Sequence, residues 1–274
     1  YPTTVYPFYL SSEICYSCHT KILLSPQMIN CQIQANLNFD TVDSSWHNIL
    51  TDALAQVNPS YLKDLQQDAD WLPGPKQIFN AFSVPLPKVR YLLVGESAYP
   101  RAASANGYAF WDAAVDQLWS PTGLNKAVNR ATSLRNLIKM LLVADGYLSP
   151  DDTSQIAIAS LDKRCFLNSL GDLFQRLLEK GYLLLNTSLV LSNQPVKQEA
   201  RCWTGFLECV LQRLYQENKN VRLILFGKVA EQLNRLEISQ NYRQLVAPHP
   251  YNLSFIQDPN VLQFFKNQQL LLKQ

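Results

Sequence analysis

Residues 89–100 read Val-Arg-Tyr-Leu-Leu-Val-Gly-Glu-Ser-Ala-Tyr-Pro. The first six residues are mostly apolar with little alternation, which predicts a strand that is covered on both of its faces. The next six are small, polar or turn-forming residues and begin with a glycine. In open α/β sheets, ligands bind in the crevice beyond the carboxyl ends of the strands. Residues 95–100 are therefore the first candidate segment for a binding site.

Three more short runs complete the pattern, at residues 182–185, 221–226 and, with a weaker composition, 242–246. They lead into Asn186-Thr187-Ser188, Gly227-Lys228 and His249-Pro250. Amphipathic stretches of helical period lie between the runs, at residues 133–142, 167–180 and 203–217. Strands that alternate with helices predict an α/β fold with a central parallel four-stranded sheet and helices on both faces.

The bulk composition narrows the choice only a little. A chain of 274 residues, 47% of them hydrophobic, is long enough for one sizeable domain. The formal net charge of +2 is lower than that of most proteins that bind nucleic acid by charge alone, so charge does not identify a partner. No apolar run approaches the roughly 20 residues of a membrane span. We therefore expect no membrane partner. A cytoplasmic location, with association with the nucleoid as needed, is the default expectation.

Residues 1–43 have a different character from the rest. They are rich in Tyr, Ser, Thr and Cys and show no clear period, which predicts an N-terminal extension before an α/β domain at 44–274. Cys15, Cys18 and His19 form the Cys-x-x-Cys-His string of c-type haem attachment, so a haem or redox protein is one reading. Zinc held by Cys15, Cys18 and Cys31 is a second possibility, and plain reduced thiols are the favoured one.

The segments beyond the strands resemble those of the family-one uracil-DNA glycosylases, from about Trp46 to the C-terminus. Eight segments occur in the family's order: Trp46 to Leu50, Pro75 to Phe82, Gly95 to Pro100, Gly107 to Phe110, Ser133 to Asn136, Leu183 to Thr187, Phe226 to Ala230 and Ala247 to Ser254. Enzymes of this family flip the target base out of the DNA stack before they cleave its glycosidic bond. The resemblance implies the same fold and reaction, without a metal or cofactor, in a monomer that acts on uracil-containing DNA.

The resemblance also implies a role for each matched residue. Asn186 would pair with uracil through O4 and N3–H, and Phe110 would stack on the base. Tyr99 would exclude the methyl group of thymine. His249 would donate to uracil O2 as the bond breaks, and Leu253 would wedge into the DNA stack.

Other matched positions would line the pocket or contact DNA. Helix N-termini, backbone N–H groups and small hydroxyls favour phosphates. The expected pocket residues are Gly95 and Ala98, and the expected DNA contacts are Ser133, Ser254, Pro250, Gly227, Lys228 and the backbone around Pro75.

The chain departs from the family's pattern at Ser97. The family has an aspartate there, whose anion orients the attacking water and stabilises the cationic sugar, and an uncharged serine does neither well. Glu96 stands where the family has glutamine, and we hypothesise that its carboxylate partly substitutes. Two readings follow: a glycosylase with Glu96, Ser97 and His249 at its catalytic centre, or an inactive member that binds DNA or a protein. The joint presence of Asn186 and His249 with both pocket aromatics favours the enzyme.

Overall fold

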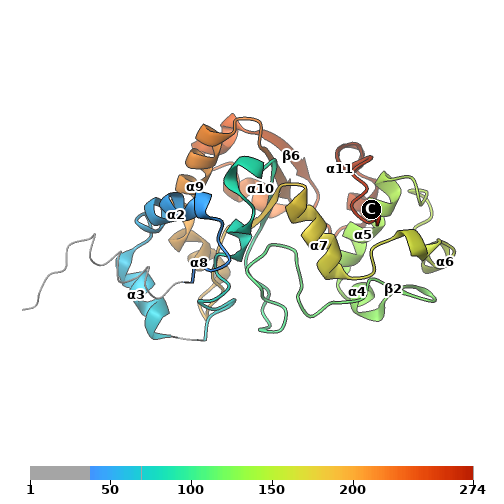
Figure 1. Cartoon of the computed structure of the whole chain (residues 1–274), viewed down its shortest axis with the longest axis horizontal. Coiled ribbons are helices and arrows are strands. Elements are labelled where there is room, and N and C mark those ends of the chain that lie inside the picture. Colours follow the sequence, from blue (N-terminus) through green and yellow to red (C-terminus); the bar gives the residue numbers. More distant parts are fainter. Residues whose placement is uncertain (1–37, 69, 274) are drawn as a thin grey trace, which may run out of the picture.

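The computed structural model describes residues 38–68 and 70–273. Its centre is a four-stranded sheet with the order β4-β1-β5-β6, and all neighbouring strands are parallel (Figure 1). The strands are β1 (Tyr91–Gly95), β4 (Tyr182–Asn186), β5 (Arg222–Phe226) and β6 (Arg243–Ala247). The predicted fold class is confirmed, and all four strands lie within two residues of their expected positions.

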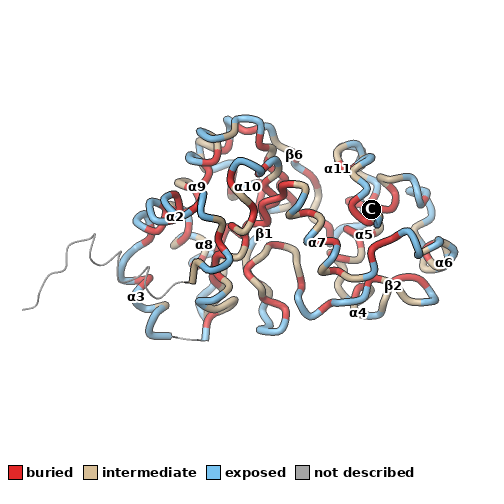
Figure 2. Tube along the Cα trace, in the orientation of Figure 1, coloured by how far each residue is buried: buried red, intermediate tan, exposed pale blue. Residues whose placement is uncertain are grey.

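Both faces of the sheet are buried, which explains the unbroken apolar runs. Successive side chains of a strand point to opposite faces. Accordingly Leu92 and Val94 belong to one buried cluster while Leu93 belongs to the other. Figure 2 shows this burial concentrated along the strands at the centre of the molecule. Each buried Leu or Val side chain stabilises the fold by roughly 1.5–3 kcal/mol relative to exposure, so the sheet is the main core.

Helices cover the two faces separately (Figure 1). One buried cluster includes residues of α2 (His47–Leu54), α3 (Pro59–Gln67), α9 (Thr204–Glu217) and α10 (Lys228–Leu233), and α8 (Val196–Cys202) packs beside α9. The other includes residues of α4 (Lys126–Arg130), α5 (Thr132–Ala144), α6 (Gln155–Ala159), α7 (Leu170–Glu179) and α11 (Pro259–Phe265). The three expected helices correspond to α5, α7 and α9.

Local hydrogen bonds explain where the elements differ from the expected ranges. Helix α7 begins at Leu170 because the Ser169 side chain accepts from the Asp172 N–H at 3.0 Å and caps the first turn. Strand β1 begins two residues late because the Val89 N–H closes a turn on the Leu86 carbonyl. That turn ends a short 3-10 helix, η3 (Leu86–Lys88).

Short elements fill the connections. The described 3-10 helices besides η3 are η1 (Ser44–Trp46), η2 (Asn80–Ser83), η4 (Lys163–Cys165), η5 (Glu237–Asn241) and η6 (Leu253–Gln257). A small antiparallel hairpin, β2 (Trp119–Ser120) with β3 (Gly123–Leu124), packs against α6.

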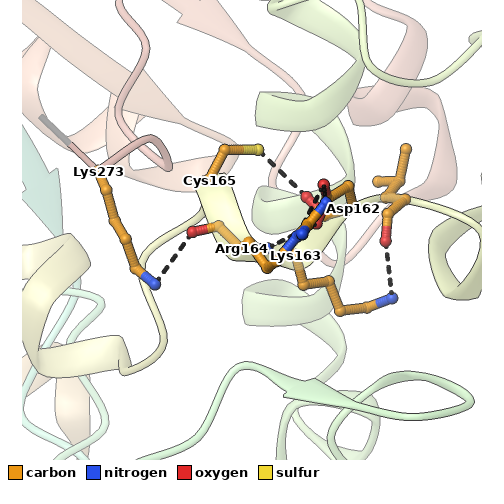
Figure 3. Close-up of polar contacts among 6 residues, drawn as sticks. Asp162, Lys163, Arg164, Cys165 and Lys273 are labelled. Carbon is orange, nitrogen blue, oxygen red and sulfur yellow. Dashed lines mark hydrogen bonds and ion pairs between the residues drawn. The ribbon is translucent and has the colours of Figure 1, made fainter.

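The C-terminal residues are tied to the segment that contains η4. The Leu167 N–H donates to the Leu271 carbonyl at 2.7 Å, and the Lys273 N–H donates to the Cys165 carbonyl at 2.8 Å. The Lys273 ammonium also donates to the Arg164 carbonyl at 3.2 Å (Figure 3). These bonds join the last described residues of the chain to a segment more than a hundred residues earlier.

Packing on the domain already starts before residue 44. Val42 is buried in the same cluster as α2, and the Phe39 ring lies 5.1 Å from the Phe79 ring. The boundary at residue 43 stays a prediction. The haem, zinc and thiol interpretations of Cys15, Cys18 and Cys31 concern residues outside the described part of the chain.

Candidate active site

The carboxyl ends of the four strands open into a cleft with a volume of about 580 Å³. Its lining residues are Gly95, Glu96, Ser97, Ala98, Tyr99, Pro100, Phe110, Ser133, Asn186, Phe226, Gly227, Lys228, Val229, His249, Tyr251 and Asn252. Eleven of the fifteen residues that the sequence proposes for the site are among them. The cleft therefore has the position that the strand-end segments predict.

Asn186 lies at the floor of this cleft, at the end of β4. It pairs in register with Gly95 of β1, and a Cβ on Gly95 would lie 2.3 Å from Oδ1 of Asn186. Only a glycine leaves room for this side chain. Asn186 is 4% exposed as a residue, and its amide forms no hydrogen bond with the described residues. Because Asn186 lines the cleft, both amide atoms remain available to a ligand that enters it.

His249 reaches the cleft from the segment after β6. Its Nδ1 accepts a hydrogen bond from the Tyr251 N–H at 3.1 Å. A neutral imidazole whose Nδ1 accepts carries its proton on Nε2, so the outer nitrogen is a donor. Burial lowers the pKa of His249 from its ordinary value, and the carboxylate of Glu96 opposes that shift. The neutral, donating form is therefore favoured near pH 7.

Phe110 and Tyr99 form the side of the cleft near His249. The Phe110 ring lies 6.3 Å from the His249 ring and 6.0 Å from the Phe226 ring. Phe110 has a φ of +64°, in the left-handed region that non-glycine residues rarely adopt. The Tyr99 hydroxyl donates to the Phe110 carbonyl at 3.2 Å, and burial raises the pKa of Tyr99 to about 12. Tyr99 therefore stays a neutral donor that fastens Phe110.

The loop after β1 is held by the end of β4. The Thr187 hydroxyl and the Ser188 N–H both donate to the Glu96 carbonyl, at 2.8 and 3.0 Å. The Glu96 side chain is exposed at the cleft. The Ser97 hydroxyl has one long contact, 3.5 Å to the Ala98 carbonyl. The loop thus presents a free carboxylate and a weakly held hydroxyl to the cleft.

The proposed DNA contacts divide into two groups. Ser133, Gly227 and Lys228 line the cleft. The others do not: Leu253 and Ser254 are exposed on η6, Pro250 is buried, and Pro75 is exposed in the loop before η2. Leu253 is 71% exposed, so its side chain packs little against the domain.

The loop that contains Pro75 is joined to the chain beyond β4. Leu72 and Leu191 exchange two backbone hydrogen bonds of 2.9 Å each. The Asn136 amide donates to the Pro250 carbonyl at 2.7 Å and so fixes the segment that precedes Leu253. These bonds attach the residues outside the cleft to the elements that form it.

Sequence reasoning missed Tyr251 and Asn252 as cleft residues, as well as Pro100, Phe226 and Val229 as members of its wall. The position of Tyr251 directly after His249-Pro250 was the available signal. Its side chain is 67% exposed, and its backbone N–H fixes the His249 tautomer.

No group of three His, Cys, Asp or Glu side chains placed to hold a metal ion occurs within residues 38–68 and 70–273. Cys165, Cys202 and Cys209 are free thiols. In the same described ranges, no helix is long and apolar enough to cross a membrane.

Comparison with known proteins identifies relatives over most of the chain. No family model matches it. The chain is 39% identical to the wild-type UNG of Nitratifractor salsuginis, whose crystal structure matches with a TM-score of 0.84 over 89% of this chain and 98% of that one. It is 27% identical over 196 residues to the uracil-DNA glycosylase of Lachnoclostridium phytofermentans, which covers 71% of this chain and 74% of the relative.

Two more distant comparisons agree. The uracil-DNA glycosylase of Acinetobacter baumannii strain AYE is 26% identical over 230 residues, which is 81% of this chain and 84% of that protein. The crystal structure of mimivirus uracil-DNA glycosylase is 16% identical with a TM-score of 0.53, over 81% of this chain and 74% of that one, and shares the fold.

Proposed function

The chain belongs to the uracil-DNA glycosylase superfamily, and from this premise we propose that it hydrolyses the N-glycosidic bond of uracil in DNA after the base is flipped into the strand-end cleft. The observation that carries the proposal is the Asn186 amide, which lines the cleft and forms no hydrogen bond with the described residues. An amide offers one donor and one acceptor side by side, which matches O4 and N3–H of uracil. Cytosine presents the opposite pattern at these two positions.

His249 supplies the electrostatic part of the reaction. As the glycosidic bond breaks, negative charge develops on the leaving uracil and gathers on O2. A neutral imidazole with its proton on Nε2 donates a hydrogen bond to that oxygen. The Tyr251 N–H bond to Nδ1 and the lowered pKa both support this tautomer.

Phe110 and Tyr99 select and hold the base. The Phe110 ring offers a flat face for stacking, a contact worth roughly 1–3 kcal/mol. Tyr99 stands where the methyl group of thymine would go. Because its hydroxyl is bonded to the Phe110 carbonyl, Tyr99 cannot turn aside without losing that bond.

The DNA backbone would be gripped around this pocket. Leu253 projects into solvent and suits a wedge that fills the space left by the flipped base. The phosphate contacts that we propose are Ser133, Ser254, Gly227, Lys228 and the backbone around Pro75. Pro250 is buried and has no N–H donor, so its part is to hold the segment before Leu253 through its carbonyl, which accepts from Asn136. All of these roles are hydrogen bonds, stacking or steric contacts, so the scheme requires no metal or organic cofactor.

Glu96 is the candidate for orienting the attacking water, because Ser97 has no charge with which to do so. The Glu96 carboxylate is exposed at the cleft and close enough to His249 to raise its pKa. A carboxylate there would also stabilise the cationic sugar of the transition state. Loss of one such electrostatic group commonly lowers the rate by about 10²–10³-fold, so we expect slower turnover than in relatives with aspartate.

An alternative function rests on the same substitution. If neither Glu96 nor Ser97 activates water, the protein is a glycosylase fold that binds uracil-containing DNA or a protein without turnover. The weakly held Ser97 hydroxyl favours this reading, and the intact pocket around Asn186 opposes it.

The test is an excision assay on a labelled oligonucleotide that contains one uracil, followed by alkali cleavage. We expect cleavage by the natural protein, loss of it in His249→Ala and a faster rate in Ser97→Asp. Activity that appears only in Ser97→Asp would identify the inactive alternative. Unchanged activity in Glu96→Gln would remove Glu96 from the mechanism. Absence of cleavage by the natural protein and by Ser97→Asp would contradict the proposed function.

A further inference from the structure

A second groove lies beside the active cleft, between α8 and α10, with a volume of about 500 Å³. Its lining residues are Thr187, Lys197, Ala200, Arg201, Thr204, Leu207, Lys228, Glu231, Gln232, Leu233, Arg235 and Leu236. Of these lining residues, Lys228 is the one that the proposed function uses as a DNA contact. Its two walls come from helices on the same face of the sheet.

Four of the lining residues are cationic. Lys197 and Arg201 stand four positions apart on α8, so they share one face of that helix. Lys228 and Arg235 lie on the opposite wall, at the start of α10 and just beyond its end. All four side chains are exposed, and none forms an ion pair within the described part of the chain. Glu231 is the single acidic lining residue.

The groove adjoins the active cleft at Lys228. Lys228 lines both cavities, and Thr187 follows Asn186 directly. The Thr187 hydroxyl donates to the Glu96 carbonyl and approaches the Gln232 amide oxygen at 3.3 Å. A DNA strand that passes from the cleft over Lys228 would therefore reach the groove directly.

The length of the groove fits several phosphates. The six residues of α10, from Lys228 to Leu233, span about 9 Å, and Arg235 lies two residues beyond them. One strand of DNA carries a phosphate every ~3.4 Å along the duplex axis, and a stretched single strand carries them farther apart. Two to three phosphates thus span the wall, which matches paired cations on its two sides.

We propose that this groove binds the sugar-phosphate backbone of the DNA strand that leaves the active cleft, at nucleotides beyond those next to the uracil. The identity of the strand as substrate rests on the proposed function. The four cations of the groove suit any acidic polymer. Because Lys228 also lines the active cleft, the DNA strand bound in that cleft is favoured over a separate acidic protein. The groove thereby lengthens the binding site without touching the flipped base.

The test measures binding by fluorescence anisotropy with labelled single-stranded DNA that contains no uracil, so catalysis does not enter. A long oligonucleotide that reaches past the cleft is compared with a short one that fills the cleft only. The variant is Lys197→Gln with Arg201→Gln, and the matched control is Lys88→Gln with Lys219→Gln. The control pair is also exposed, and its substitution removes the same charge. Lys88 and Lys219 precede β1 and β5, so they lie at the amino ends of the strands, whereas the cleft lies at the carboxyl ends.

For the long DNA, two lost phosphate contacts should flatten the slope of log affinity against log salt by about 1.4 and weaken binding on the order of ten-fold at low salt. The short DNA and the control should change little. An unchanged slope in the variant, or an equal loss in the control, would overturn the proposal. So would an equal loss with the short DNA. Circular dichroism checks that both variants fold.

Excision from a second version of the short oligonucleotide, which contains one uracil, reports separately on the proposed function. If the natural protein excises no uracil but the groove variant still loses salt dependence on long DNA, the groove stands and the catalytic proposal fails. If excision occurs and the slope does not move, the reverse holds.

Discussion

A Cβ atom on Gly227 would lie 2.8 Å from the Cβ of His249, closer than real Cβ atoms approach other carbons. Gly227 also has a φ of +64°. It follows β5 while His249 follows the neighbouring strand β6, so a missing side chain on one strand end sets the position of the imidazole on the next. The donor on His249 is thus placed partly by a residue that makes no polar contact with it.

Gly227→Ala should therefore lower the rate of excision strongly while it lowers the thermal stability of the fold only moderately. The left-handed backbone costs alanine about 1–2 kcal/mol, and the added methyl group must displace His249. We expect at least a ten-fold loss in kcat, because small displacements of a catalytic group are costly. Thermal unfolding and single-turnover rates would be compared with those of Gly146→Ala. That control also has a positive φ, of +81°, but its Cβ would meet no atom within 4 Å. Equal rates in the two variants would contradict this view of Gly227.

Asn186→Leu should abolish excision without destabilising the protein. The amide forms no hydrogen bond with the described residues, so an apolar side chain of similar volume breaks none of them. We expect the free energy of urea unfolding to stay level or rise. A clear decrease would mean that the amide contributes to the folded state in a way that the hydrogen bonds do not reveal.

The pH profile should reflect the neutral His249. Its pKa is lowered from about 6.5, so excision should persist as the pH falls through 6.5 and decline only once the imidazole is protonated. The Glu96 carboxylate raises this pKa, so Glu96→Gln should move the acid limb of single-turnover rates to lower pH, whatever it does to the maximum. A shift to higher pH would show that the two groups do not interact as described.

Thr187→Val should loosen the loop after β1. It removes the hydroxyl that donates to the Glu96 carbonyl, which costs about 0.5–1.5 kcal/mol of stability. We expect a several-fold lower kcat, because the loop positions Glu96 and Ser97 at the cleft. Thr204→Val serves as the control, since that hydroxyl donates to the Ala200 carbonyl one helical turn earlier. Similar rates in both variants would argue against a role for the anchor.

Leu253→Ala should leave the fold unaffected and weaken activity on duplex DNA. The side chain is 71% exposed, so its truncation removes almost no packing. If it fills the space left by the flipped base, single-turnover rates should fall more on double-stranded than on single-stranded substrate, where no stack must be held open. An equal loss on both would contradict the wedge.

The sheet was predictable because each strand is buried on both faces, which leaves an unbroken apolar run in the sequence. The ends of the helices were harder to predict. The start of α7 depends on one capping side chain, that of Ser169, and on the backbone hydrogen bond by which Leu167 pairs with the distant Leu271. Helices α8 and α10 have seven and six residues, fewer than two full turns, which is too short for a helical period to be recognised in the sequence. The groove between them was therefore not predictable.

Site residues were predictable where they directly follow a strand, as Asn186 and Glu96 do. Two relationships had no local signal: the left-handed backbone of Phe110 and the contact of Gly227 with His249. Each depends on segments that meet only in the folded chain or on a backbone conformation that residue type does not reveal. The resemblance to known glycosylases located the side chains but not the bonds that orient them.

The register between β1 and β4 has a consequence for how the protein becomes active. Glu96 and Thr187 meet although 91 positions separate them in the chain. Parallel pairings between distant segments form slowly, because the chain loses the entropy of closing a long loop before the new contacts stabilise it. The pocket is therefore assembled late, by the same step that completes the central sheet. Recovery of uracil excision during refolding should coincide with the final global phase, and no partly folded species should process DNA.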